Sequence, residues 1–145
     1  MTVDLDIING LKCPYCNSKT EFINSQEIYG KDYGNIYICR SCSAYVGVHN
    51  GTNKALGRLA NKELRELKKV AHFHFDKIAK TSLINEIWPE YIENTSNRQK
   101  AYLWLSKQMN IEPEYCHIGM FDEHQCLKAI SICSKIIYEK TIKHE

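Results

Sequence analysis

Two cysteine pairs with the same internal spacing are the residues in this chain best suited to chemistry. Cys13 pairs with Cys16 and Cys39 with Cys42, each across a gap of two residues, and 22 residues separate the pairs. A two-residue gap lets one tight turn present two thiolates to an ion, and four thiolates complete the tetrahedral shell of a structural Zn²⁺. The spacing therefore predicts one structural zinc ion. Its closed shell would leave no position for substrate water, so the ion would stabilise the fold and take no part in catalysis.

Disulfide bonds are the alternative use of these four cysteines. The residues after Met1 have neither the basic nor the apolar region of an export signal. No run approaches the roughly 18 apolar residues of a membrane helix. We therefore expect a cytoplasmic protein without membrane association. In a reducing compartment, paired Cys-x-x-Cys turns are more often metal sites than disulfides.

A second group of side chains suggests metal-dependent hydrolysis. His72 and Asp76 are four residues apart in a predicted helix and would share one face, and His49 is a third potential ligand. A metallonuclease would also need a further ligand and a general base around an open coordination position. The sequence offers no further carboxylate at a suggestive spacing. It therefore favours a non-enzymatic protein, with a small metallonuclease as an open alternative.

The three remaining cysteines allow two interpretations. Cys116, Cys126 and Cys133, together with His117, are ligand types that could hold a second zinc ion. Free cysteine is also among the most buried residue types. Cys126 and Cys133 are two helical turns apart, which is typical of a core stripe. The sequence therefore favours packing over a second metal.

Basic residues are concentrated in one segment of the chain. The net charge is only +2, but residues 51–80 hold eight Lys or Arg against three Asp or Glu. Four of these basic residues recur at helical spacing and form a basic stripe. The stripe consists of Arg58, Lys62, Arg65 and Lys69. It could contact the phosphates of DNA or RNA and release their counterions. Because Glu63 and Glu66 lie among these residues, an ordinary solvated helix face is the alternative.

Short strands must position the two cysteine pairs. We predict strands at Thr20–Ile28, Asn35–Ile38 and Ala44–Val48, with a glycine-containing turn after the first. Asn17 directly follows Cys16 and suits a left-handed backbone conformation. These elements predict a zinc ribbon. Its tyrosines could stack on nucleic-acid bases or simply cover the small sheet; they are Tyr29, Tyr33, Tyr37 and Tyr45.

Helices are predicted for the rest of the chain. Asn61 is a good N-cap for a helix that runs to Lys80, with apolar residues three and four positions apart. Residues 84–94 read as irregular, and the role of residues 81–96 stays open. Further helices are expected after two capping-box patterns, Ser96 with Gln99 and Asp122 with Gln125. The predicted fold class is α+β, with an N-terminal zinc ribbon (a small antiparallel β-sheet) at residues 1–52 and an α-helical region at 53–145.

Taken together, several motifs resemble a known family. They are Cys13-Pro-Tyr-Cys16, Glu27-Ile-Tyr-Gly30, Cys39 to Cys42, Val46-Gly47 with His49, Gly51-Thr52, Leu56-Gly-Arg-Leu-Ala60, Ala71-His72 and Cys116-His-Ile-Gly-Met-Phe-Asp122 followed by Gln125-Cys126. The chain resembles the zinc-finger-containing domain family of bacteriophages and prophages, whose function is uncharacterised. Ala55 and Lys77-Ile78 depart from the family pattern. The resemblance implies a zinc ribbon and a phage or mobile-element setting inside a bacterial host cell, and it supplies no catalytic residues.

Besides the metallonuclease, the sequence allows two functions from different classes. The first is a nucleic-acid-binding accessory protein, in which the ribbon and the basic stripe contact phosphates. The second is a phage-encoded factor that binds and modulates a host enzyme or a defence protein, with zinc purely structural. The near-neutral net charge and the acidic C-terminal half suit the second function. We favour the first because the basic residues are concentrated in one stripe.

Overall fold

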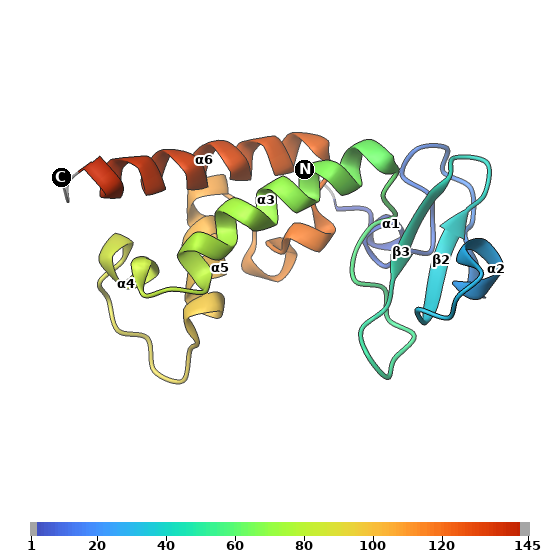
Figure 1. The fold of residues 1–145 in the computed structure, drawn as a ribbon, viewed down its shortest axis with the longest axis horizontal. Helices are drawn as coiled ribbons and strands as arrows, with labels where there is room; N and C mark the ends of the chain where they lie inside the picture. The colour runs from blue at the N-terminus through green and yellow to red at the C-terminus, as the bar shows by residue number, and fades with distance from the viewer. Residues whose placement is uncertain (1–2, 143–145) are drawn as a thin grey trace. The chain divides into compact units, whose positions relative to one another are not determined.

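A computed structural model describes residues 3–142 and shows the predicted α+β fold, a three-stranded sheet followed by helices (Figure 1). The elements are α1 (Leu5–Ile8), β1 (Glu21–Asn24), α2 (Gln26–Tyr29), β2 (Asn35–Cys39), β3 (Ala44–Gly47), α3 (Lys62–Ala79), α4 (Leu83–Ile87), α5 (Asn97–Met109), η1 (Pro113–Tyr115), η2 (Ile118–Met120) and α6 (Glu123–Ile142). Within residues 3–142, no helix has the length and apolar character needed to cross a membrane.

The chain forms two compact units, Met1–Arg65 and Glu66–Glu145. The sheet belongs to the first unit, and residues 53–65 belong there too. The predicted domain boundary after residue 52 stays a prediction, because compactness does not establish which segments fold on their own. Helix α3 begins in the first unit and ends in the second.

The sheet of the first unit is antiparallel, with the strand order β1-β2-β3. Ile38 pairs with Tyr45, and Ile36 pairs with Gly47. Beyond β3, the backbone of Tyr45 exchanges two hydrogen bonds with that of Ala60, at 3.2 and 2.9 Å. The segment before α3 therefore protects part of the outer edge of β3.

The first strand is shorter than predicted. The sequence predicts a strand over Thr20–Ile28, but β1 ends at Asn24 and Gln26–Tyr29 form the short helix α2. The Asn24 side-chain oxygen accepts a hydrogen bond from the Gln26 backbone N–H at 2.9 Å and turns the chain out of the sheet. Gly30 then ends α2 in the left-handed conformation, at φ 72°.

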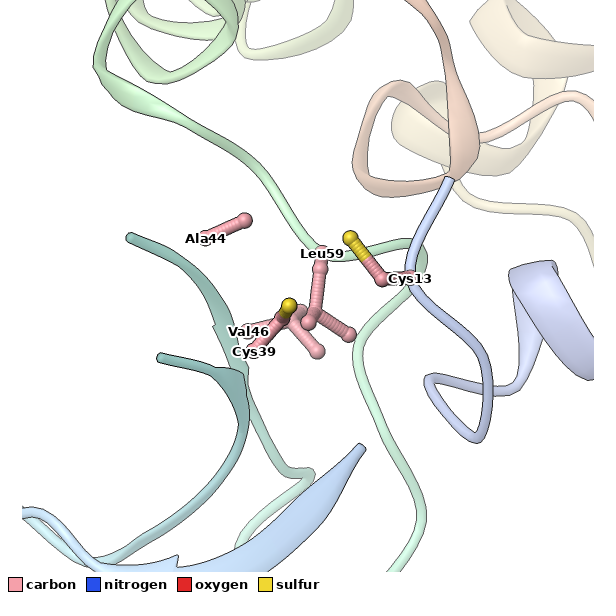
Figure 2. Packing of buried hydrophobic residues seen from close by; sticks show 5 residues of the cluster. All are labelled: Cys13, Cys39, Ala44, Val46 and Leu59. Atoms are coloured by element: carbon pink, nitrogen blue, oxygen red, sulfur yellow. The ribbon is translucent and has the colours of Figure 1, made fainter. Parts of the chain in front are cut away.

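A small core lies beside the sheet and includes two of the predicted zinc ligands. Its buried members are Cys13, Cys39, Ala44, Val46 and Leu59, shown in Figure 2. Tyr37, Cys42 and Ala55 pack against this cluster with partly exposed side chains. Few large apolar residues contribute, which is expected of a module that depends on a metal ion or a partner for stability.

Helix α3 begins as predicted. The Asn61 side chain accepts a hydrogen bond from the Leu64 N–H at 2.9 Å, which is N-cap geometry. Most of the predicted apolar stripe is buried, including Leu64, Phe75 and Ile78. The helix ends at Ala79, one residue before the predicted end.

In the second unit, α5 contacts α4, η1 and α6. The capping box of α5 is present, with Ser96 Oγ accepting from the Gln99 N–H at 3.1 Å. Where α6 begins, the Asp122 N–H donates to Gln125 Oε1 at 3.0 Å, and the Gln125 N–H donates to Asp122 Oδ1 at 2.8 Å. The prediction of an irregular segment over residues 84–94 was partly wrong. Leu83–Ile87 form α4, which ends before Trp88-Pro89 because a residue preceding proline disfavours helix.

Candidate metal centre

Two turns bring the four cysteines of the predicted zinc site together. Each turn ends on a residue with a left-handed backbone: Asn17 follows Cys16 at φ 64°, and Ser43 follows Cys42 at φ 52°. The sequence predicts this conformation for Asn17 but not for Ser43, although both directly follow the second cysteine of a pair. In the first turn, the Asn17 N–H donates to the Cys13 carbonyl at 2.8 Å.

The four sulfur atoms are spaced for one shared ion. The Sγ atoms of Cys13, Cys16, Cys39 and Cys42 all lie within 4.8 Å of one another, and the Cys16 and Cys39 sulfurs are 3.6 Å apart. A disulfide would need about 2.05 Å. A tetrahedral ion with metal–sulfur bonds of about 2.3 Å places its ligands about 3.8 Å apart. The arrangement therefore fits a metal tetrahedron and not a pair of disulfides.

Hydrogen-bond donors surround the sulfurs. The Tyr15 backbone N–H donates to Cys13 Sγ at 3.4 Å, and Ser41 Oγ lies 3.3 Å from Cys39 Sγ. Hydrogen bonds from the side chain and backbone of Ser18 lower the pKa of Cys16 to about 6. Donors of this kind stabilise a thiolate, which is the form that binds a metal.

Two thiols of this cluster keep their protons more strongly than a free cysteine does. A hydrogen bond with Cys16 and, secondarily, burial raise the pKa of Cys42 to about 12. Burial also raises the pKa of Cys13. Without a positive ion, four thiolates at this spacing repel one another and some of the thiols must keep their protons. A divalent cation would remove that penalty and release the protons.

Within residues 3–142, these cysteines are the only group of three or more metal-binding side chains close enough to share an ion. Cys116, Cys126 and Cys133 are buried, as the packing interpretation of Cys126 and Cys133 predicts. Burial raises the pKa values of Cys116 and Cys133 to about 12, which keeps them as neutral thiols.

The residues of the possible metallonuclease site make contacts that do not involve one another. His72 Nδ1 lies 2.9 Å from the Lys68 carbonyl, so this nitrogen is the donor, and Asp76 Oδ2 lies 3.3 Å from Lys80 Nζ. Asp76 Oδ1 is the only buried side-chain nitrogen or oxygen in the described part of the chain that lacks a hydrogen-bond partner. His49 belongs to the first compact unit, Met1–Arg65, which we call the ribbon unit, and it lines a hollow there.

The four residues of the basic stripe have different environments. Lys62 and Lys69 are exposed, and Lys69 has only a surface ion pair with Glu66 at 3.5 Å. Arg58 is half-buried. The Arg65 guanidinium donates a hydrogen bond to the Ala60 carbonyl at 2.7 Å and lies 4.4 Å from the centre of the Tyr45 ring. Arg65 therefore stabilises the ribbon unit, a role that helical spacing alone does not reveal.

The model of a family described as a zinc-finger-containing domain matches residues 9–136. No curated protein and no solved structure matches the chain. The family match covers both cysteine pairs and most of the helical residues.

Proposed function

Because this chain belongs to the family of zinc-finger-containing domains, we propose that it is a zinc-ribbon nucleic-acid-binding accessory protein. The four cysteines would hold one structural Zn²⁺, which would hold the two turns in place and supply folding energy. A phage or mobile-element setting within a bacterial cell is part of this proposal and rests on the resemblance of the motifs.

The exposed ammonium groups on α3 are the observation that carries the binding proposal. Lys62 begins the helix, and Lys69 follows two turns later, about 10 Å along the axis. Side chains seven residues apart lie on nearly the same face, so the two lysines can reach separate phosphates of one strand. Contacts of this type position a protein on nucleic acid without reading its sequence.

A salt titration tests the proposal. Phosphate contacts from Lys62 and Lys69 would contribute about −2 to the log–log slope of affinity against salt concentration. Changing Lys62→Gln and Lys69→Gln together should flatten the slope by about two units. Arg65 is left intact in this variant, because its guanidinium also supports the ribbon.

A second pair of lysines supplies the control. Lys128 and Lys135 are exposed and also seven residues apart, but on α6. Changing both to glutamine removes the same charge and should leave the slope unchanged. Equal flattening by the two double variants would indicate general attraction to a polyanion and contradict a site on α3. An absence of binding at low salt would contradict the proposed function.

One observation favours the protein-interaction alternative. On α3, Val70 and Phe73 are 44% and 60% exposed, although both are apolar. They are three residues apart and therefore neighbours on the helix surface. If a protein partner binds there, Phe73→Ser should abolish that interaction and leave the salt dependence of nucleic-acid binding unchanged.

A further inference from the structure

Three tyrosines form a surface array on the ribbon. The Tyr33 and Tyr29 rings meet edge to face at 6.2 Å, and the Tyr29 and Tyr45 rings do so at 5.6 Å. The Arg65 guanidinium covers the far side of the array, 4.4 Å from the Tyr45 ring centre. We call Tyr33, Tyr29 and Tyr45 the tyrosine ladder. Burial and a hydrogen bond with Tyr45 raise the pKa of Tyr29 to about 12, which keeps the Tyr29 hydroxyl protonated.

Exposure increases along the tyrosine ladder away from Arg65. Tyr45 is half-buried, Tyr29 is 44% exposed and Tyr33 is 72% exposed. The Tyr33 backbone is nevertheless held firmly, since its N–H donates to Ser25 Oγ at 2.7 Å and Ser25 is only 1% exposed. The Ser25 N–H also donates to the Gly34 carbonyl at 2.9 Å. An exposed ring on an anchored turn is a preorganised platform, because ordering it on binding costs little entropy.

A hollow adjoins the tyrosine ladder on the same face of the sheet. It has a volume of about 440 Å³ and is lined by Tyr33, Ile36 and Gly47, among others. Gly47 and Tyr45 are two residues apart on β3, so the hollow and the ladder share one face. A Cβ at Gly47 would meet the Leu56 side chain at 3.6 Å, so Leu56 lies directly beside the glycine in the wall of the hollow.

The rim of the hollow is chemically suited to base edges. Asn50 and Asn53 line the space and bring amide side chains to its rim, and His49 lines it as well. An amide offers both donors and acceptors, as the edge of a nucleobase does. The volume is within the range of small-ligand pockets, which accommodates a single nucleotide.

Charge around the tyrosine ladder is compatible with a polyanion. Arg40 pairs with Glu21 of β1 at 2.6 Å and with Glu27 of α2 at 3.2 Å, so a cation accompanies both carboxylates. Lys31 is exposed in the turn that carries Tyr33. Asp32 is the remaining acid of that turn, and its carboxylate accepts hydrogen bonds from the Asn24 side chain and the Gly34 N–H.

We propose that the tyrosine ladder and the adjoining hollow bind single-stranded nucleic acid by stacking unpaired bases, with Tyr33 as the main platform. The inference rests on the proposed function. It adds that the bound nucleic acid is single-stranded and that its bases, not only its phosphates, are contacted. Aromatic platforms bind single strands because every base has a π face, whereas bases in a duplex are already stacked. Phosphate contacts alone would give no preference for unpaired bases over paired ones.

The test uses the zinc-loaded full chain and four probes: a 12-nucleotide DNA strand, the RNA of the same sequence, the matching DNA duplex and an abasic DNA strand of equal length. Tyr33→Ala should weaken binding of both single strands by about 5- to 150-fold, the loss of about one stacked base. Tyr33→Phe should retain binding. The ratio of the affinities for the DNA and RNA single strands shows which of the two nucleic acids the site prefers.

Tyr91→Ala is the matched control, since Tyr91 is 87% exposed and lies outside the ribbon unit. It should bind like the wild type. A second readout needs no variant: 2-aminopurine in the single strand should be quenched by the wild-type protein. Quenching supports stacking even if Tyr33→Ala fails to fold, and its absence contradicts stacking.

The remaining outcomes separate the two proposals. If the abasic strand and the duplex bind as tightly as the intact single strands, base stacking is wrong and phosphate binding stands. The same conclusion follows if Tyr33→Ala binds like the wild type. If no probe binds at low salt, both the inference and the proposed function are wrong.

Discussion

The guanidinium of Arg65 lies 4.4 Å from the centre of the Tyr45 ring and donates a hydrogen bond to the Ala60 carbonyl. Ala60 is also the backbone partner of Tyr45. One side chain in the first turns of α3 therefore joins the edge of the sheet to the segment that covers it. A cation over an aromatic ring contributes about 0.5–2 kcal/mol, depending on its desolvation.

Arg65→Gln should therefore destabilise the ribbon unit by about 1–2 kcal/mol, through loss of the ring contact and the hydrogen bond to Ala60. Lys62→Gln removes an exposed charge and should change stability by less than about 0.5 kcal/mol. Urea unfolding of the zinc-loaded proteins measures both effects. Equal stability of the two variants would show that the Arg65 contacts contribute nothing in solution.

Cys13→Ser should remove the bound metal and unfold the ribbon unit. Structural zinc sites bind with about 10–16 kcal/mol of apparent free energy, and that energy is coupled to folding. Metal analysis should find one zinc per wild-type chain and none in the variant, with loss of ordered ribbon signals in NMR spectra. Cys116→Ala should retain the metal.

Other metal contents would give different conclusions. Two zinc ions per wild-type chain would restore Cys116, His117 and Cys126 as ligands. Disulfides between the ribbon cysteines, without metal, would contradict the zinc site.

The buried thiol of Cys133 should lower stability at alkaline pH. Burial raises its pKa to about 12, whereas an unfolded cysteine ionises near pH 8.5. The stabilising contribution is fully present below about pH 8.5 and decreases as the pH rises toward 12, by up to about 1.4 kcal/mol per pH unit. The stability of Cys133→Ala should fall less steeply than that of the wild type between pH 8.5 and 10.5, as measured by urea unfolding. Parallel curves would mean that the Cys133 thiol is hydrated.

Ser43→Gly should stabilise the second cysteine turn. Ser43 has φ 52°, and glycine adopts this conformation without the steric cost that a β-carbon imposes. We expect a gain of up to about 1 kcal/mol, partly offset by the greater entropy of glycine in the unfolded chain. Ser43→Val should have the opposite effect, because a β-branched residue is poorly tolerated at positive φ. Thermal unfolding with zinc present measures the difference.

The local signals in the sequence were strong enough to predict most elements. The turn within each cysteine pair, the Asn61 cap and the Ser96–Gln99 capping box each depend on residues within a few positions of one another, and all three appear in the structure. Such patterns act through local backbone geometry and local hydrogen bonds.

Other features could not be predicted in the same way, because they depend on a distant contact or on an unusual local conformation. Arg65 fits a basic helical stripe by spacing, yet it contacts a ring 20 positions earlier in the chain. Strand β1 was predicted too long, since β propensity continues past Asn24 while one side-chain hydrogen bond to Gln26 ends the strand. The left-handed Ser43 was missed because serine is an unusual residue for that conformation.

Helix α3 has a consequence for how the gene could be divided. The boundary between the two compact units falls between Arg65 and Glu66, inside Lys62–Ala79. A cut there leaves the ribbon with four helical residues and gives the other fragment a helix without its Asn61 cap. A helix of four residues is not stable in isolation, because the entropy lost in ordering the first turn exceeds the stabilisation from its hydrogen bond. Recombination that exchanges one half of the protein for another would therefore have to transfer α3 whole, and inheritance should keep the ribbon and this helix together.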